Sequence, residues 1–299
     1  MKSWWKIFLA AARNWKTDNV FQHAAAVSFY TLFSLAPITI IAVTVAGVVF
    51  GRETAARELE KQIAALVGPA SAEIVRAAVQ ATETTRSSTW STVAGAALML
   101  FGATTVFAQL QSALNQIWHV RTKPSRSGWP ILVMQRLLSF AMVLTLGFLL
   151  LVSLAISTAV ATLVEWFGER LFGSSVLLKT ADLGAGLLVI TVLFALLFKV
   201  LPDVKLRWRD VWTGAIVTAV LFTVGRYLIA LYLAHSTVAS VYGVAGSLVA
   251  LLVWVYYSCA ILFYGGEFIR AYRSAHRLTI EPKSTAEVVR IESGVRADS

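Results

Sequence analysis

The sequence predicts an all-α, polytopic membrane protein with six transmembrane helices. Of its 299 residues, 58% are hydrophobic and only 14% are charged, and the mean hydropathy is +0.71. Soluble domains carry close to 25% charged residues. The apolar residues also form runs of about 20, the length that a helix needs to cross a bilayer core. The predicted spans are Ala24–Phe50, Ser91–Gln111, Leu137–Val164, Leu183–Leu201, Val211–Ala234 and Gly246–Phe268.

Residues 1–23 precede the first span and predict an amphipathic helix at the membrane surface. At 100° per residue, an apolar and a basic side separate: Trp4, Phe8, Ala11 and Trp15 against Lys2, Lys6 and Arg13. Such a helix lies on an anionic leaflet. The short apolar stretch before Arg13 is not typical of a secretory signal, so we expect this segment to stay on the mature protein.

The transmembrane domain, residues 24–272, includes one substantial outer loop at residues 51–90. An apolar stripe and a charged i,i+4 ladder run through its first part, and Gly68 and Pro69 end that pattern. We expect two short amphipathic helices there. Residues 273–299 are predicted to be a flexible cytoplasmic tail, because they mix charges and show no strong period.

The distribution of charge predicts the orientation in the membrane. With six spans, most of the 26 Lys and Arg residues fall on the side that holds both termini. The positive-inside rule therefore places both termini in the cytoplasm. The net charge of +10 is then explained by orientation and lipid contact, and we expect no nucleic-acid partner.

No pattern of an enzyme is present. The four histidines are scattered without carboxylates at ligand spacing, and no nucleophile, phosphate-loop or zinc motif occurs. The single Cys259 excludes an intrachain disulfide. We therefore expect no catalytic residue, metal or cofactor.

Candidate site residues lie first in the opening span. Tyr30 and Ser34 belong to an unusually polar stretch, and Pro37 lies near its midpoint. Proline removes a backbone hydrogen bond, so the helix is expected to kink or break there. Freed backbone groups are tolerated beside protein or a water-filled cavity. This stretch is either a substrate site with a hinge or an ordinary kink.

The cytoplasmic end of the second span adds Gln109, Ser112 and Asn115. Amides and hydroxyls at this spacing could line a polar path, but small and polar residues also form packing seams between helices. Both interpretations stay open.

Arg226 and Glu267 are the buried charges of the fifth and sixth spans. An unpaired Arg at depth is costly, so Arg226 either faces a cavity or extends to the headgroups. Glu267 either serves a cavity or pairs with basic residues such as Arg270. The two are predicted to mark opposite ends of a cavity, because Arg226 lies about 23 Å above the cytoplasmic side of the membrane and Glu267 lies near that side.

These residues resemble the YihY/BrkB family of bacterial inner-membrane proteins, once named ribonuclease BN. The likeness runs from about Trp15 to Tyr272, through AAAVSFYTLFSLAPITIIAV at 24–43 and SVYGVAGSLVALLVWVYYSCAILFYGGEF at 240–268. It implies six spans and the inner membrane. By position, the motif residues are Tyr30, Ser34, Pro37, Tyr242, Gly243, Gly246, Gly266 and Glu267. The family is suspected of moving lipids or small solutes, and it has no agreed catalytic residues.

The sequence therefore predicts a transporter or flippase-like protein for a lipid or an anionic small solute. The predicted substrate pathway consists of nine residues: Tyr30, Ser34, Pro37, Gln109, Ser112, Asn115, Arg226, Tyr242 and Glu267. Membrane lipids are the expected partners, and a homo-oligomer stays open. One alternative is a non-catalytic scaffold or envelope-assembly protein. The other, implied by the old family name, is a tRNA-processing ribonuclease, for which only Asp203 and Asp210 offer paired cytoplasmic acids.

Overall fold

The computed structural model describes residues 4–67, 105–123, 175–235 and 246–289, and most of these residues are helical. The prediction of a mostly helical protein is confirmed. Its labelled elements are α1 (Trp4–Thr17), α2 (Val20–Phe50), α3 (Arg52–Val67), β1 (Val120–Thr122), α7 (Ser175–Val200), α8 (Trp208–His235), α10 (Gly246–Ala275) and β2 (Ala286–Val288). Residues 105–117 are also helical and lead into β1.

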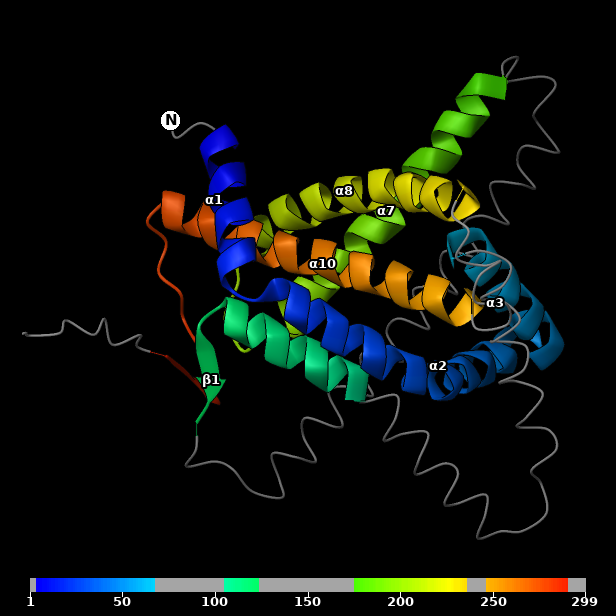
Figure 1. Cartoon of the computed structure of the whole chain (residues 1–299), viewed down its shortest axis with the longest axis horizontal. Helices are drawn as coiled ribbons and strands as arrows, with labels where there is room; N and C mark the ends of the chain where they lie inside the picture. Colours follow the sequence, from blue (N-terminus) through cyan, green and yellow to red (C-terminus); the bar gives the residue numbers. More distant parts are fainter. Residues whose placement is uncertain (1–3, 68–104, 124–174, 236–245, 290–299) are drawn as a thin grey trace, which may run out of the picture.

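Helix α10 lies at the centre of the described bundle and packs against α1, α2 and α8, while α7 packs against α8 (Figure 1). Close packing is possible because the core is lined by fully buried aromatic and aliphatic side chains, among them Trp118, Phe198 and Phe263. Small residues bring the helices together: Gly265 of α10 lies against Thr218 and Phe198.

One end of the bundle carries a two-stranded ribbon, in which β1 and β2 pair antiparallel with Val120 opposite Val288. We call this the ribbon end. Helices α2 and α8 start at the ribbon end (Figure 1). The C-terminal ends of the 105–117 helix, α7 and α10 lie there too. This end therefore gathers the residues that the sequence places on one side of the membrane.

Helix α1 packs against α10 along part of its apolar side. Ile7 and Ala11 are buried against Phe268 and Ala271 of α10, and the indole Nε1 of Trp15 donates a hydrogen bond of 2.9 Å to the Ala260 carbonyl. On the other side of α1, Trp5 and Leu9 are exposed. The predicted amphipathic helix is present, but part of its apolar surface belongs to the bundle core.

Helix α2 runs without interruption from Val20 to Phe50, so the chain does not break at Pro37. A single missing N–H bond leaves the adjoining turns paired, which is why a long helix can continue through proline. It ends at Gly51, whose φ of 82° is a conformation that glycine adopts without strain. Helix α3 follows where the sequence predicts the first helix of the loop 51–90, whereas the predicted second loop helix and third span lie outside the described residues.

The structure describes residues 273–289, which the sequence assigns to a flexible cytoplasmic tail, as a helix end, a bridge and a strand. Helix α10 continues to Ala275, and the chain then returns along the ribbon end, where Pro282 forms an antiparallel bridge with Val204 before β2 pairs with β1. Backbone hydrogen bonds hold this C-terminal segment, and such bonds leave no hydrophobic period in the sequence. Residues 290–299 lie outside the described part.

Within the described residues, two stretches are long and apolar enough to cross a membrane by length and composition, Trp208–Ile229 and Leu248–Ala275. The apolar stretch Gly186–Val200 is shorter. The expectation of membrane-length helices is thus met at the fifth and sixth predicted spans.

The contact at Gly265 provides a test of the packing. A Cβ there would lie 2.0 Å from Thr218 Oγ1 and 2.6 Å from Phe198 Cζ, both buried. Gly265→Ala is therefore expected to lower the free energy of unfolding by about 1–3 kcal/mol through overpacking. Thermal unfolding in detergent measures this. Gly186→Ala is the control, because nothing lies within 4 Å of its Cβ position; equal stability of both variants would contradict the packing.

Candidate functional site

The ribbon end contains a network of buried polar side chains centred on Asp203, in the turn between α7 and α8. Asn115 Nδ2 donates to Asp203 Oδ2 at 2.9 Å, and the Asp203 backbone N–H donates to Asn115 Oδ1 at 2.8 Å. Gln111 Nε2 adds a longer contact of 3.3 Å to Asp203 Oδ1. All three side chains are buried. The reciprocal bonds fix the 105–117 helix against this turn.

Lys283 of the C-terminal segment joins the same network. Its Nζ donates to the Val200 carbonyl at 3.0 Å, and its backbone N–H donates to the Asp203 carbonyl at 2.9 Å. Burial lowers the pKa of Lys283, while the charge of Asp203 opposes this and that of Lys199 adds to it. The segment is therefore anchored by a partly desolvated lysine at the C-terminal end of α7.

A second cluster surrounds Arg270, near the end of α10. Its Nη2 lies 3.1 Å from Glu267 Oε2, and its Nη1 lies 2.8 Å from Asp18 Oδ2, in the turn between α1 and α2. Nη1 also donates to the Ile117 carbonyl and contacts His119 Nε2 at 2.6 Å. One guanidinium thus joins α10, the α1–α2 turn and the 105–117 helix.

His119 accepts from Arg270 through Nε2, which requires the neutral ring with its proton on Nδ1. Burial lowers the pKa of His119, the charge of Arg270 lowers it further, and Asp18 opposes both. The residue has a positive φ of 50°, in the left-handed region that is uncommon outside glycine. Its backbone ends the 105–117 helix and its ring closes the Arg270 cluster.

A third pair ties the C-terminal segment to α8. Arg273 Nη1 bonds to Asp210 Oδ2, and Arg273 Nη2 donates to the Thr279 carbonyl. Both charged side chains are buried. The two acids on which the ribonuclease alternative rests are therefore held separately, Asp210 by Arg273 and Asp203 by amides. Among the described residues, no group of three or more His, Cys, Asp or Glu side chains could hold a metal ion.

The structure brings some predicted site residues together. A pocket of about 510 Å³, here called the amide pocket, opens beside the Asp203 network. Ser112 and Asn115 line it, together with residues that the prediction omitted: Gln111, Gln116, His119 and Arg121. Gln109 is half-buried on the same helix but is not among the lining residues. Of the described residues that line this pocket, none is acidic.

The other candidates lie elsewhere. Tyr30 of α2 is partly exposed and Ser34 is buried, and neither lines the amide pocket. Tyr242 lies outside the described residues, as do the surroundings of Pro37. Glu267 is fully buried and paired with Arg270, which agrees with the ion-pair interpretation. Glu267 does not line the amide pocket, but its partner Arg270 contacts the lining residue His119.

Arg226 is half-buried on α8, and its guanidinium lies over the ring of Tyr227, 5.3 Å from the centroid. At 1.5 Å per residue it lies about 27 Å along the helix from Trp208 at the ribbon end. It is therefore not part of the amide pocket. The predicted separation of Arg226 from Glu267 agrees with these positions.

The sequence did not identify Gln111 and Lys283 as members of the Asp203 network, or Asp18 and His119 as members of the Arg270 cluster. A local signal existed for Gln111 alone, because it lies one helical turn before Asn115. The others come from distant segments, and only the folded chain brings them together.

Comparison with known proteins now identifies the family. The sequence model described as Virulence factor BrkB matches residues 11–288, almost the whole chain. The chain belongs to this family. The match includes the 105–117 helix and the C-terminal segment up to residue 288, so the Asp203 network and the Arg270 cluster lie within the part of the chain that matches the family.

Relatives support this assignment. The chain is similar to a UPF0761 membrane protein of Pseudoalteromonas translucida, with 24% identity over 270 residues, which cover 88% of this chain and 84% of the relative. A UPF0761 membrane protein of Stenotrophomonas maltophilia is 30% identical over 250 residues, covering 80% of this chain and 54% of the relative. This chain thus spans about half the length of the latter protein. No solved structure matches the chain.

The His119–Arg270 contact predicts a pH-dependent stability. Since the pKa of His119 is lower in the folded protein than the usual 6.5, the unfolded chain binds more protons in the interval between these values. The free energy of unfolding should therefore fall as the pH drops below about 6.5. Comparing thermal unfolding of wild type and His119→Gln across this range isolates the contribution.

In the His119→Gln variant, the loss of stability on acidification should be smaller than in wild type. The exposed His276 serves as the matched control, because His276→Gln removes a histidine outside the Arg270 cluster. Identical pH profiles for His119→Gln and wild type would refute the role assigned to the contact.

Proposed function

We propose that this BrkB-family protein is a transporter or flippase-like protein of the bacterial inner membrane, and that it moves a lipid or an anionic small solute. The amide pocket carries this proposal. Its volume of about 510 Å³ lies within the range of small-molecule sites. It offers amide and hydroxyl groups with one Arg and no acid, which suits a polar or anionic group.

The amide pocket lies at the C-terminal end of the 105–117 helix, which overlaps the second predicted span, Ser91–Gln111. Asp203 and Asn115 hold its wall rigid through their reciprocal hydrogen bonds. Beside this wall, the hydroxyl of Ser112 and the amide of Gln116 are exposed to the pocket, and polar groups held on a rigid wall favour ligand binding over simple packing. Arg226, on the distant part of α8, is a candidate for contact with an anionic group at the opposite membrane face.

The proposed topology has six spans with both termini in the cytoplasm, and the ribbon end then faces the cytoplasm. Helices α2 and α8 begin at the ribbon end, whereas the 105–117 helix, α7 and α10 end there, and these directions support the proposed topology (Figure 1). So does the basic character of the ribbon end, which carries Lys16, Lys205 and Arg209 as exposed side chains. No nucleotide-binding motif occurs in the sequence, so transport would follow a gradient or depend on a partner.

Cysteine labelling tests this topology. In a Cys259→Ala background, Ser274→Cys places a thiol on the ribbon end and Thr54→Cys places one on α3, and both positions are exposed. An impermeant maleimide added to intact spheroplasts should label the Thr54 variant, and it should label the Ser274 variant only after permeabilisation. The reverse pattern, or labelling of both in intact cells, would disprove the proposed orientation.

Reconstitution into liposomes tests transport. The protein should translocate fluorescent lipids or anionic solutes, and Ser112→Trp should strongly reduce the rate by filling the amide pocket from its exposed position. Val220→Trp is the control, because Val220 is exposed on α8 away from the pocket. Equal rates in both variants, or no translocation by wild type across a panel of lipids and anions, would reject the proposal.

The scaffold alternative differs in one measurable respect. If the polar network only packs helices, Asn115→Ala would lower stability while every flux stayed at the level of protein-free liposomes. The buried ion pair between Arg273 and Asp210 is the observation that favours this alternative, because it joins α10 to α8 and lies outside the amide pocket.

A further inference from the structure

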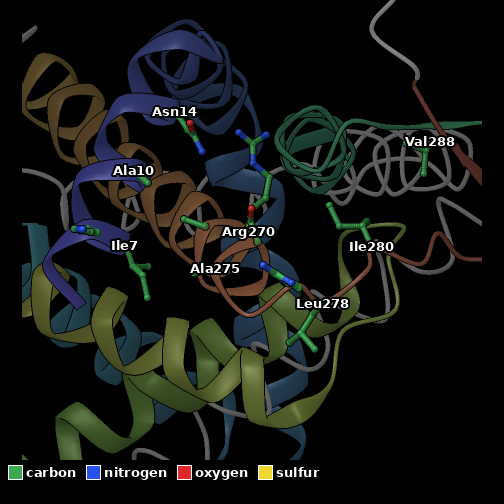
Figure 2. A pocket seen from close by; sticks show the side chains of 12 residues that line it. Ile7, Ala10, Asn14, Arg270, Ala275, Leu278, Ile280 and Val288 are labelled. Atoms are coloured by element: carbon green, nitrogen blue, oxygen red, sulfur yellow. The ribbon is translucent and has the colours of Figure 1, made fainter. Parts of the chain in front are cut away.

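A second and larger pocket lies at the ribbon end, between α1, the end of α10 and the C-terminal segment. Its volume is about 870 Å³. Figure 2 shows Ile7 and Ala10 on one side of this space, Ala275 on α10, and Leu278 and Ile280 on the returning chain. We call it the basic pocket, because its charged lining residues are Lys6, Arg270 and Arg277. Of the described residues that line it, none is acidic.

The charges of this pocket are only partly neutralised. Arg270 pairs with Asp18 and Glu267. Lys6 and Arg277 are exposed, and neither makes an ion pair with another described residue. Asn14 and Ser274 add hydrogen-bonding side chains to the same lining. The pocket therefore presents two cations that no acidic side chain of the described residues compensates, above a mainly apolar floor.

The backbone at Arg277 supports a role for its side chain. Arg277 has a φ of 54° at the end of α10, where its N–H bonds to the Ser274 carbonyl and the Leu278 N–H bonds to the Arg273 carbonyl. Glycine is the residue favoured at such a helix end, and another residue costs about 1 kcal/mol or more there. A strained position of this kind is typical of functional sites. Arg277 thus occupies a position whose backbone conformation favours glycine.

We propose that the basic pocket binds the phosphate group of an anionic glycerophosphate ester. Lys6 contributes a point charge and Arg277 a bidentate donor for phosphate oxygens. The apolar floor, including Ile7 and Ile280, accommodates the glycerol and adjoining carbon atoms. The exposed Trp5 and Leu9 of α1 would hold this entrance at the membrane surface, where phosphatidylglycerol supplies such a group. The site does not depend on transport.

Binding measurements on the purified full-length protein test this inference. Inorganic phosphate and glycerol 3-phosphate serve as soluble probes in titration calorimetry, and phosphatidylglycerol serves as the lipid probe in native mass spectrometry, with phosphatidylcholine for comparison. Wild type should bind at least one of the phosphate-ester probes saturably, and the double variant Lys6→Ala/Arg277→Ala should lose roughly tenfold or more in affinity, because two charge-assisted contacts disappear.

The control is Lys16→Ala/Arg209→Ala, which removes the same charge from exposed positions at the ribbon end that do not line the pocket. Saturable binding of glycerol 3-phosphate indicates a soluble ester, and binding of phosphatidylglycerol alone indicates a lipid headgroup. Either supports the site. Absence of saturable binding by every phosphate-ester probe, or equal loss in the two double variants, overturns it.

Arg277→Gly separates binding from folding. Glycine adopts the left-handed conformation without strain, so this variant should unfold at the same or a higher temperature than wild type. The variant should nevertheless bind more weakly whichever phosphate-ester probe, glycerol 3-phosphate or phosphatidylglycerol, the wild type binds. Unchanged affinity in a stable Arg277→Gly variant would show that the arginine side chain is not part of a phosphate site.

Discussion

The ribbon end depends on one partly buried guanidinium, that of Arg270. Glu267 is fully buried within α10, and a carboxylate without a partner in such a place would be strongly unfavourable. Arg270 supplies the partner, and the same group reaches Asp18 before α2 and the Ile117 carbonyl at the end of the 105–117 helix. Elements far apart in the chain thus meet at Arg270. Its contacts define where α1 and the second predicted span stand relative to α10.

The C-terminal segment completes this arrangement from the other side. Lys283 bonds to the end of α7 and to the turn after it, and Arg273 bonds to Asp210 of α8. Strand β2 pairs with β1, the strand that follows the 105–117 helix. Both pockets depend on it, because Val289 lines the amide pocket and Ile280 lines the basic pocket. The two pockets lie near the same charge cluster, with Arg270 lining one and its contact His119 lining the other. A change at Arg270 would therefore affect both.

Part of the site follows from local patterns. Ser112 and Asn115 share one helix, so their spacing predicts a common polar edge, and the structure places both in the amide pocket. The ion pair of Glu267 with Arg270 follows from their spacing of three residues on a helix. Asp203 and Lys283 could not be assigned in this way, because their partners lie in other segments. The ordered C-terminal segment was missed for the same reason.

The sequence by itself determined that the chain is largely helical, where its described long helices lie, and that it resembles the family to which it belongs. These properties depend on composition and on short-range periodicity, which a linear pattern contains. Only the tertiary structure decided which charges are paired, that α2 continues through Pro37, and that residues 276–289 close the ribbon end. Those outcomes depend on contacts between distant segments, and the pairing of a buried charge or a backbone group is settled only when its partner arrives.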